Sequence, residues 1–403
     1  ECMKTFLQPL QNLAEMEEIQ KQAKKNRGIL EISGCMESQK AHLMYGLSGL
    51  FPCHLVIAAD EKSAKELYED YRFYDKRVYY YPAKDLLFFQ ADIHGNLLIR
   101  QRMQVIRALL EREDEITVVT SIDGCMDYLA PLEKIEKQLI HFRNDSTLDM
   151  DKLTAALVHM GYERVGQVEM PGQFSIRGGI IDIYSLTEEN PWRIELWGDE
   201  IDSIRSFDAQ SQRSLENLDD VTIYPAAEQP MEKNGVSFLD YFKETETLFF
   251  LDELNHLEEN AKAVQEEFQQ SCENRKEKGE ISLSGDWMCT WEELCHKIND
   301  RNCVAMSLLD PKKSNWKISG QFNITVKSMS SYQSSFELLV KDLKQYKKEG
   351  YQIVLLSGSR TRAERLAKDL QEEGLNAFYG QDSDRILQPG EIMVAYGHAR
   401  RGF

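Results

Sequence analysis

Residues 28–41 read GILEISGCMESQKA, an apolar stretch that runs into a glycine and then into a segment of helical composition. This order predicts a strand over 28–33, a loop, and a helix over 38–49. Further short apolar strands, alternating with amphipathic helices, are expected at 54–59, 77–81 and 116–120. Strands that alternate with helices are typical of a parallel, doubly wound sheet, so the sequence predicts an α/β first domain.

The loop of this unit, GCMESQKA at 34–41, aligns with the phosphate-binding pattern GxxxxGK[ST]. It keeps Gly34 and Lys40, but Gln39 replaces the second glycine, and Ala41 replaces the hydroxyl that would hold magnesium. Glu37 adds a negative charge where a triphosphate would enter. The segment predicts a degenerate, RecA-like nucleotide site without catalytic residues or cofactor. The alternative is a chance match before an ordinary helix.

A second partial motif lies far along the chain. The apolar run LFFL at 248–251 ends in Asp252 and Glu253, as does the magnesium-holding strand of helicase-like ATPases. The alternative is a buried strand that ends in surface acids. Together the two motifs predict a motor-type domain that kept its fold and lost its chemistry.

Composition favours some classes of function over others. The 403 residues include 67 acidic and 48 basic ones, a net charge of −19, whereas a DNA-binding surface needs clustered Lys and Arg. The balance favours a protein partner over strong DNA binding by this chain. Neither a membrane-spanning stretch nor a signal peptide is expected. Eight cysteines without a CxxC pair indicate reduced thiols and a cytoplasmic location.

One group of potential metal ligands is a candidate zinc site. Its residues are Cys289, Cys295, His296 and Cys303. Their spacing matches no common zinc pattern, so no metal is expected.

The character of the sequence changes after the first unit. A helix at 152–160 precedes three long strand candidates, 163–168, 173–184 and 192–207. Consecutive strands with short turns predict an antiparallel meander, a small α+β domain inserted in the first. A last small α/β unit is expected from a helix with apolar Phe336, Leu339, Val340 and Leu343, a strand at 353–357, a helix at 361–373 and a strand at 392–396. The expected domains are 1–127, 128–215, 216–327 (completing the first) and 328–403.

Two runs in the meander carry a family resemblance. Residues 161–184 read GYERVGQVEMPGQFSIRGGIIDIY, and 193–208 read RIELWGDEIDSIRSFD, with QRS at 212–214. They resemble the second domain of UvrB and of the transcription-repair coupling factor (Mfd). The degenerate loop, and the little room for a damage-probing hairpin between 81 and 98, resemble Mfd rather than UvrB. The sequence is therefore similar to the UvrB-like N-terminal half of Mfd, ahead of the polymerase-interacting and translocase domains.

The resemblance implies that the second domain docks UvrA. Carried over by position, Arg177 is the strongest candidate contact and Arg164 the next, while Phe174, Arg205 and Glu195 are weaker ones. Arginine is frequent at the centres of interfaces because its planar fork pairs with carboxylates. The alternative is that both leading arginines pair with neighbouring acids on a solvated sheet.

Two details bear on these arginines. UvrB has another arginine at the position of Ser175, so part of the charge contact is expected to be missing or supplied elsewhere. Gly178 and Gly179 predict a bulge that would re-aim Arg177.

The resemblance implies a non-catalytic adaptor that recruits UvrA to RNA polymerase stalled at DNA lesions and restrains the C-terminal translocase. Contacts with RNA polymerase and DNA are expected through domains outside this chain, which is expected to be monomeric. Two alternatives stay open. One is a UvrB-type ATP-dependent excision-repair enzyme, and the other is an autoinhibitory clamp that only contacts the C-terminal domains.

Overall fold

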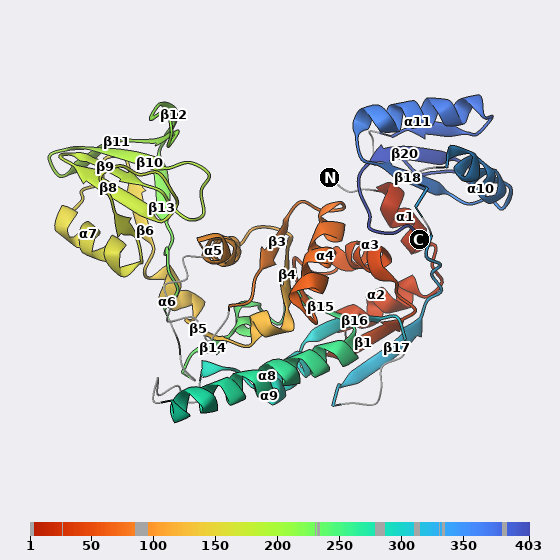
Figure 1. The fold of residues 1–403 in the computed structure, drawn as a ribbon, viewed down its shortest axis with the longest axis horizontal. Coiled ribbons are helices and arrows are strands. Elements are labelled where there is room, and N and C mark those ends of the chain that lie inside the picture. The colour runs from red at the N-terminus through yellow and green to blue at the C-terminus, as the bar shows by residue number, and fades with distance from the viewer. Residues whose placement is uncertain are drawn as a thin grey trace.

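The chain forms three parts in a computed structural model. The first domain lies between an inserted domain on one side and a third domain on the other (Figure 1). The structure describes residues 4–25, 27–84, 96–229, 231, 234–278, 287–309, 315–329, 331–332, 335–380 and 385–403. The segment between residues 81 and 98, where little room for a damage-probing hairpin is expected, lies largely outside these residues.

A seven-stranded parallel sheet forms the first domain, as the alternating pattern predicts. Its strand order is β17-β1-β16-β15-β2-β4-β3. The strands are β1 (Gly28–Ser33), β2 (Cys53–Ala58), β3 (Val78–Tyr81), β4 (Ile116–Ser121), β15 (Thr247–Asp252), β16 (Asn302–Ser307) and β17 (Ile318–Asn323). All six neighbouring pairs run parallel.

Helices cover both faces of this sheet. Successive residues of a strand point to opposite faces, so Ile29 joins one apolar core and Leu30 the other. One face carries α1 (Lys4–Gln11), α2 (Met16–Lys25), α3 (Glu37–Ser48) and α4 (Glu61–Arg72). The other carries α5 (Asn96–Leu110), α8 (Leu254–Glu277) and α9 (Trp291–Asn299). Helices α1 and α2 were not expected from the sequence.

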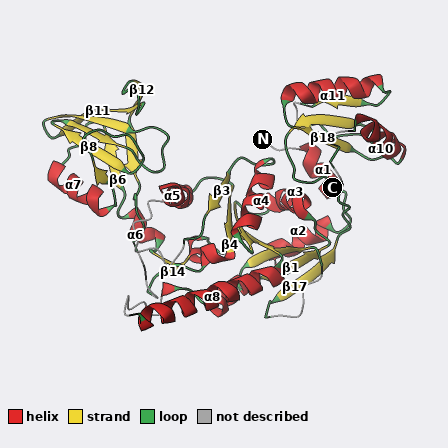
Figure 2. Cartoon of the chain, in the orientation of Figure 1, coloured by secondary structure: helices red, strands yellow, loops and turns green. Residues whose placement is uncertain are grey.

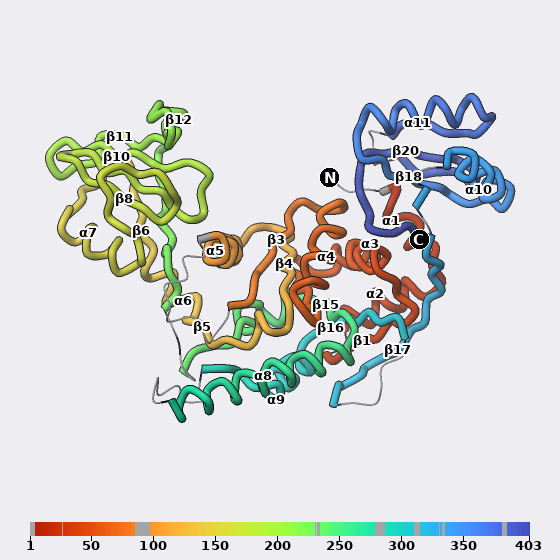
Figure 3. The backbone as a smooth tube through the Cα atoms, viewed as in Figure 1, coloured from red at the N-terminus to blue at the C-terminus, as the bar shows by residue number. Residues whose placement is uncertain are grey.

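The inserted domain leaves the first domain after a short strand and returns beside it. Figure 3 follows the chain out through α6 (Leu132–Glu136) and back past β13 (Asp220–Ile223). Strand β5 (Tyr128–Leu129) pairs with β14 (Val236–Ser237), and between them and β15 lies the short helix η2 (Phe238–Tyr241). A further short helix, η1 (Ile122–Cys125), follows β4.

A six-stranded sheet builds the inserted domain, in the order β12-β11-β10-β9-β8-β7. The strands are β7 (Glu163–Arg164), β8 (Gln173–Arg177), β9 (Ile180–Ile183), β10 (Trp192–Trp197), β11 (Glu200–Phe207) and β12 (Ser214–Leu218). Helix α7 (Met150–His159) and the antiparallel pair of β13 with β6 (Ile140–Arg143) complete the domain. Figure 2 shows that this domain contains more strand than helix.

The meander differs in detail from the expectation. The expected strand 173–184 is a hairpin whose turn lies at Gly178, with φ +60°, so the predicted bulge is wrong. The expected strand 192–207 turns at Gly198, with φ +66°. Both turns use the positive φ that glycine adopts at little cost. The expected strand 163–168 shortens to two residues that run parallel to β8.

The limits of the inserted domain also differ from the expected 128–215. Pairing of β5 with β14 assigns residues 128–129 to the first domain. Pairing of β6 with β13 extends the inserted domain to residue 223. The residues that these strands pair are roughly 80 to 110 positions apart in the chain. No local pattern in the sequence encodes such pairing.

The third domain is a three-stranded parallel sheet in the order β18-β20-β19. It contains α10 (Phe336–Lys348), β18 (Ile353–Ser357), α11 (Arg360–Glu372), β19 (Ala377–Tyr379) and β20 (Ile392–Tyr396). Leu339, Val340 and Leu343 enter its core as the helical spacing predicts. Phe336, the first residue of α10, stays 39% exposed.

Candidate functional site

The GCMESQKA segment (residues 34–41) lies at the carboxyl end of β1, where a phosphate loop would lie. Helix α3 begins at Glu37, so the loop is confined to three residues. The Gly34 amide donates to the Leu308 carbonyl at 3.2 Å, and the Cys35 amide donates to the Ser307 carbonyl at 3.0 Å. A phosphate loop needs free amides that point at the ligand. Here the first two are engaged by backbone carbonyls.

Lys40 contacts the acids of the second motif. Its ammonium lies 2.6 Å from Asp252 Oδ1 and 2.7 Å from Glu253 Oε1. The lysine and aspartate side chains are only 9% and 10% exposed. Burial alone would lower the pKa of Lys40, but the two carboxylates outweigh it and raise that pKa. Lys40 is therefore held as a cation inside the protein.

The other residues of the segment take different positions. Ala41 is fully buried, and Gln39 is 4% exposed with no hydrogen-bond partner for its Oε1. Glu37 is exposed and pairs with Arg401, 3.2 Å away, from the C-terminal end of the chain. Of the predicted site residues, the structure therefore brings Lys40, Asp252 and Glu253 together and turns Glu37 outward.

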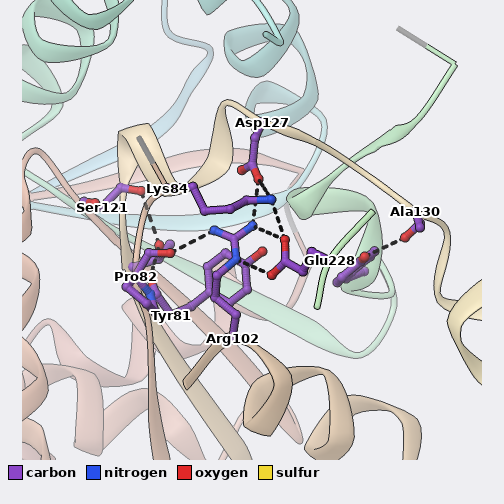
Figure 4. Close-up of polar contacts among 10 residues, drawn as sticks. Tyr81, Pro82, Lys84, Arg102, Ser121, Asp127, Ala130 and Glu228 are labelled. Atoms are coloured by element: carbon purple, nitrogen blue, oxygen red, sulfur yellow. Dashed lines mark hydrogen bonds and ion pairs between the residues drawn. The ribbon is translucent and has the colours of Figure 1, made fainter. Parts of the chain in front are cut away.

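Where the inserted domain rejoins the first, four charged residues form a buried cluster that no sequence motif indicated. The Arg102 cluster consists of Lys84, Arg102, Asp127 and Glu228 (Figure 4). Arg102 Nε donates to Glu228 Oε1 at 2.6 Å, and its Nη2 donates to Asp127 Oδ2 at 2.7 Å. Lys84 contacts both carboxylates. Burial opposes ionisation of Glu228, but Arg102 and Lys84 outweigh it and lower its pKa to about 2.

The Arg102 cluster connects three segments of the chain. Arg102 Nη1 also donates to the Pro82 carbonyl at 2.9 Å, and the guanidinium lies over the Tyr81 ring at 4.2 Å. Helix α5, the end of β3 and the chain that returns from the inserted domain are thus held together. Two cations matched to two anions leave no net charge buried, as burial requires.

In the inserted domain, Arg177 lies at the end of β8 beside a buried acid. Its Nη2 donates to Asp182 Oδ2 at 2.7 Å, while the Arg177 side chain remains 48% exposed. Arg193 Nε donates to the other oxygen, Asp182 Oδ1, at 2.7 Å. Asp182 therefore pairs with two arginines, one at each carboxylate oxygen. About half of the Arg177 side chain remains accessible to solvent.

The remaining predicted contacts differ in accessibility. Arg164 is exposed on β7, and among the described residues it makes no ion pair. Arg205 Nη2 donates to Glu195 Oε1 at 2.6 Å, so these two predicted residues pair across β10 and β11. Phe174 is fully buried in the domain core, so its ring is not available to a partner in this conformation.

Sequence reasoning missed the most exposed aromatic side chain of the described residues. Trp197, at the end of β10, is 83% exposed. The Leu196 amide donates to the Gly179 carbonyl at 2.8 Å, so the turn after β8 lies next to the turn after β10. We call Arg177, Gly178, Gly179, Trp197 and Gly198 the hairpin-end surface. A tryptophan directly before a Gly-Asp turn was the signal that could have revealed it.

The four residues of the candidate zinc site lie in different surroundings. Cys289, Cys295 and Cys303 lie in the apolar core, whereas the His296 side chain is 81% exposed. In the described part of the chain, no three His, Cys, Asp or Glu residues are grouped as metal ligands would be. No described helix is long and apolar enough to cross a membrane.

The inserted domain matches a known protein family. The UvrB interaction domain family matches residues 140–228, which begin at β6 and end at Glu228 of the Arg102 cluster. A transcription-repair-coupling factor from Bacillus subtilis (strain 168) is 28% identical over 447 aligned positions, which cover 92% of this chain and 38% of that protein. The chain is homologous to transcription-repair-coupling factors.

Transcription-repair-coupling factors of other bacteria are similar to this chain to a comparable degree. Those of Staphylococcus haemolyticus (strain JCSC1435) and Staphylococcus aureus (strain MRSA252) are 25% and 24% identical, over 81% of this chain and 32% of their own length. The chain thus spans about a third of the length of these transcription-repair-coupling factors. The resemblance stated from the sequence is confirmed, as is the α/β architecture with an inserted, mostly antiparallel domain.

Proposed function

We propose that this chain is a non-catalytic adaptor region that recruits UvrA in transcription-coupled DNA repair, through the hairpin-end surface of its inserted domain. The observation that carries the proposal is the exposure of Arg177 and Trp197 at one end of a sheet that matches the UvrB interaction domain. Tryptophan and arginine are the residues most enriched at the centres of protein interfaces. RNA polymerase and DNA would be engaged by other parts of the parent protein, in the cytoplasm.

The non-catalytic part of the proposal rests on Lys40. A lysine already paired with two buried or half-buried carboxylates has to break both pairs before it can meet a phosphate. With Ala41 in place of the magnesium-holding hydroxyl, the charge of a triphosphate would stay unbalanced. The engagement of Lys40 and the missing hydroxyl at Ala41 disfavour the alternative of a UvrB-type ATPase.

The proposal is tested by calorimetric titration of the chain with UvrA from the same source. Arg177→Ala is expected to weaken binding by about 2 kcal/mol, roughly 30-fold in Kd. Its fold should persist, because Arg193 still neutralises Asp182. Arg143→Ala, an exposed arginine on β6, is the matched control and should bind as wild type does. Unweakened binding by Arg177→Ala would remove that residue from the interface.

The same preparation discriminates the alternatives. Addition of ATP and magnesium is expected to leave the unfolding temperature of the chain unchanged, and a clear rise would favour the enzyme. If the wild-type chain fails to bind UvrA at micromolar concentrations but binds the separate translocase region, the autoinhibitory clamp replaces the adaptor.

A further inference from the structure

The last residues of the chain lie against the first domain, beside the GCMESQKA segment. The Arg401 amide donates to Ser38 Oγ at 3.2 Å, and Arg401 Nε lies 3.2 Å from Glu37 Oε2. Both partners lie in the first turn of α3, the end of the helix that would face a phosphate. This turn is therefore engaged by a segment that follows the third domain.

Arg400 fixes the same segment to the neighbouring helix α4. Its Nη2 lies 2.9 Å from Asp70 Oδ2, and its Nη1 lies 2.5 Å from Glu66 Oε2. The Asp70 side chain is only 3% exposed. Because a buried carboxylate is costly without a cation, Arg400 neutralises a charge that the first domain alone would leave unpaired among its described ion pairs.

Two further contacts set the path of this segment. The Phe403 ring lies 5.5 Å from the His42 ring of α3. The Met329 amide donates to the Gly402 carbonyl at 2.8 Å, so the segment that enters the third domain pairs with the one that leaves it. Two consecutive arginines thus reach two different helices, followed by a glycine and an aromatic residue.

An apolar contact lies next to these ion pairs. Phe6 of α1 packs with Leu387, Met393 and Ala395 of the third domain. A Cβ on Gly397 would lie 2.2 Å from the Phe73 ring, so the backbone approaches the first domain closely there. The apolar contact fixes where the third domain sits, and the arginines add a charge-selective contact beside it.

We infer that the acidic edge of α3 and α4, made of Glu37, Ser38, Glu66 and Asp70, is an internal binding site for a basic peptide segment. Its occupant is residues 399–403 of the same chain. We call the contact between this site and residues 399–403 the latch, because it holds the third domain against the first domain beside the GCMESQKA segment. The basic peptide thus contacts the outward-facing side of the first turn of α3, at Glu37 and Ser38. The net charge of −19 favours a basic occupant.

Hydrogen–deuterium exchange on the 403-residue chain tests the latch amide by amide. The amides of Arg401 and Met329 report it, because both donate across the closed segment. The Gly397 amide donates to Ser357 inside the third domain and serves as an internal reference. Arg400→Gln with Arg401→Gln should speed exchange at the two reporters by about tenfold or more, as local opening does, and leave the reference unchanged. The matched control is Arg365→Gln, an exposed arginine of α11.

A charge exchange separates a specific site from general packing. Arg401→Glu alone should open the latch, and Arg401→Glu combined with Glu37→Arg should close it again, since both side chains are largely exposed. Salt at about 1 M, where the screening length is ~3 Å, should speed exchange at the reporters in wild type. Unchanged exchange in the double glutamine variant, or no recovery in the charge exchange, would overturn the latch.

Discussion

Lys40 Nζ lies 2.6 Å from Asp252 Oδ1, and the two residues are separated by more than two hundred positions in the chain. The lysine of one partial nucleotide motif is thus the ion-pair partner of the aspartate of the other. Parallel pairing of β1 with β16, and of β16 with β15, brings both strand ends to one edge of the sheet. An ion pair between protein groups thus joins the residues of the two partial motifs at this edge of the sheet.

The Lys40 pair is expected to stabilise the fold. Lys40→Met leaves a buried carboxylate without its cation and should lower the free energy of unfolding by about 3–5 kcal/mol. Adding Asp252→Asn should restore part of this loss, because the neutral amide no longer needs a cation. Urea unfolding of the wild type, Lys40→Met, Asp252→Asn and the double variant measures the coupling. A loss below about 1 kcal/mol for Lys40→Met would mean that the pair contributes no more than a surface ion pair.

Glu228 predicts a specific acid sensitivity. Its pKa in the folded chain is about 2, below the ordinary 4.5, so its ionised form adds stability at neutral pH. That contribution, about 3 kcal/mol, is fully present above pH 4.5 and is lost as the pH falls toward 2. The stability difference between wild type and Glu228→Gln should therefore shrink over this interval. A difference that does not change with pH there would contradict the lowered pKa.

Trp197 is expected to serve binding rather than folding. Trp197→Ala should change the free energy of unfolding by no more than about 0.5 kcal/mol, because the side chain is 83% exposed. It should weaken binding of UvrA by about 2 kcal/mol, as loss of a central aromatic contact does. Val158→Ala, at an exposed position of α7, is the control in the same domain. Equal affinity of the Trp197 and Val158 variants would exclude this end of the sheet from the interface.

Gly34, in the loop that precedes α3, and Gly49, the residue that follows α3, make a matched pair. Gly34 has φ +82°, and a Cβ there would lie 1.9 Å from the Ile324 carbonyl oxygen. Gly34→Ala should destabilise the chain by about 2 kcal/mol or more. Gly49 has φ −68° and open space around it, so Gly49→Ala should be neutral or stabilising by about 0.4–1 kcal/mol. Thermal and urea unfolding compare the two, and similar losses would show that the Gly34 backbone adapts.

The sequence by itself determined the parts of the fold that local patterns encode. Strands β1, β18 and β20 begin and end at the residues that their apolar runs predict, because each run is bounded by a glycine or a turn. The resemblance of residues 161–208 to UvrB and Mfd followed from the order of charged and glycine residues alone. The loss of the hydroxyl at Ala41 was visible in the same way.

Only the tertiary structure decided which distant residues meet. Pairing of Lys40 with Asp252, the Arg102 cluster, and the contact of Arg401 with Glu37 each join residues far apart in the chain, and no periodicity encodes such pairs. Burial of Phe174 and exposure of Trp197 likewise depend on which face of the sheet is covered. The physical reason is that apolar spacing specifies a buried face, whereas charge partners and the limits of an inserted domain are set by how those faces pack.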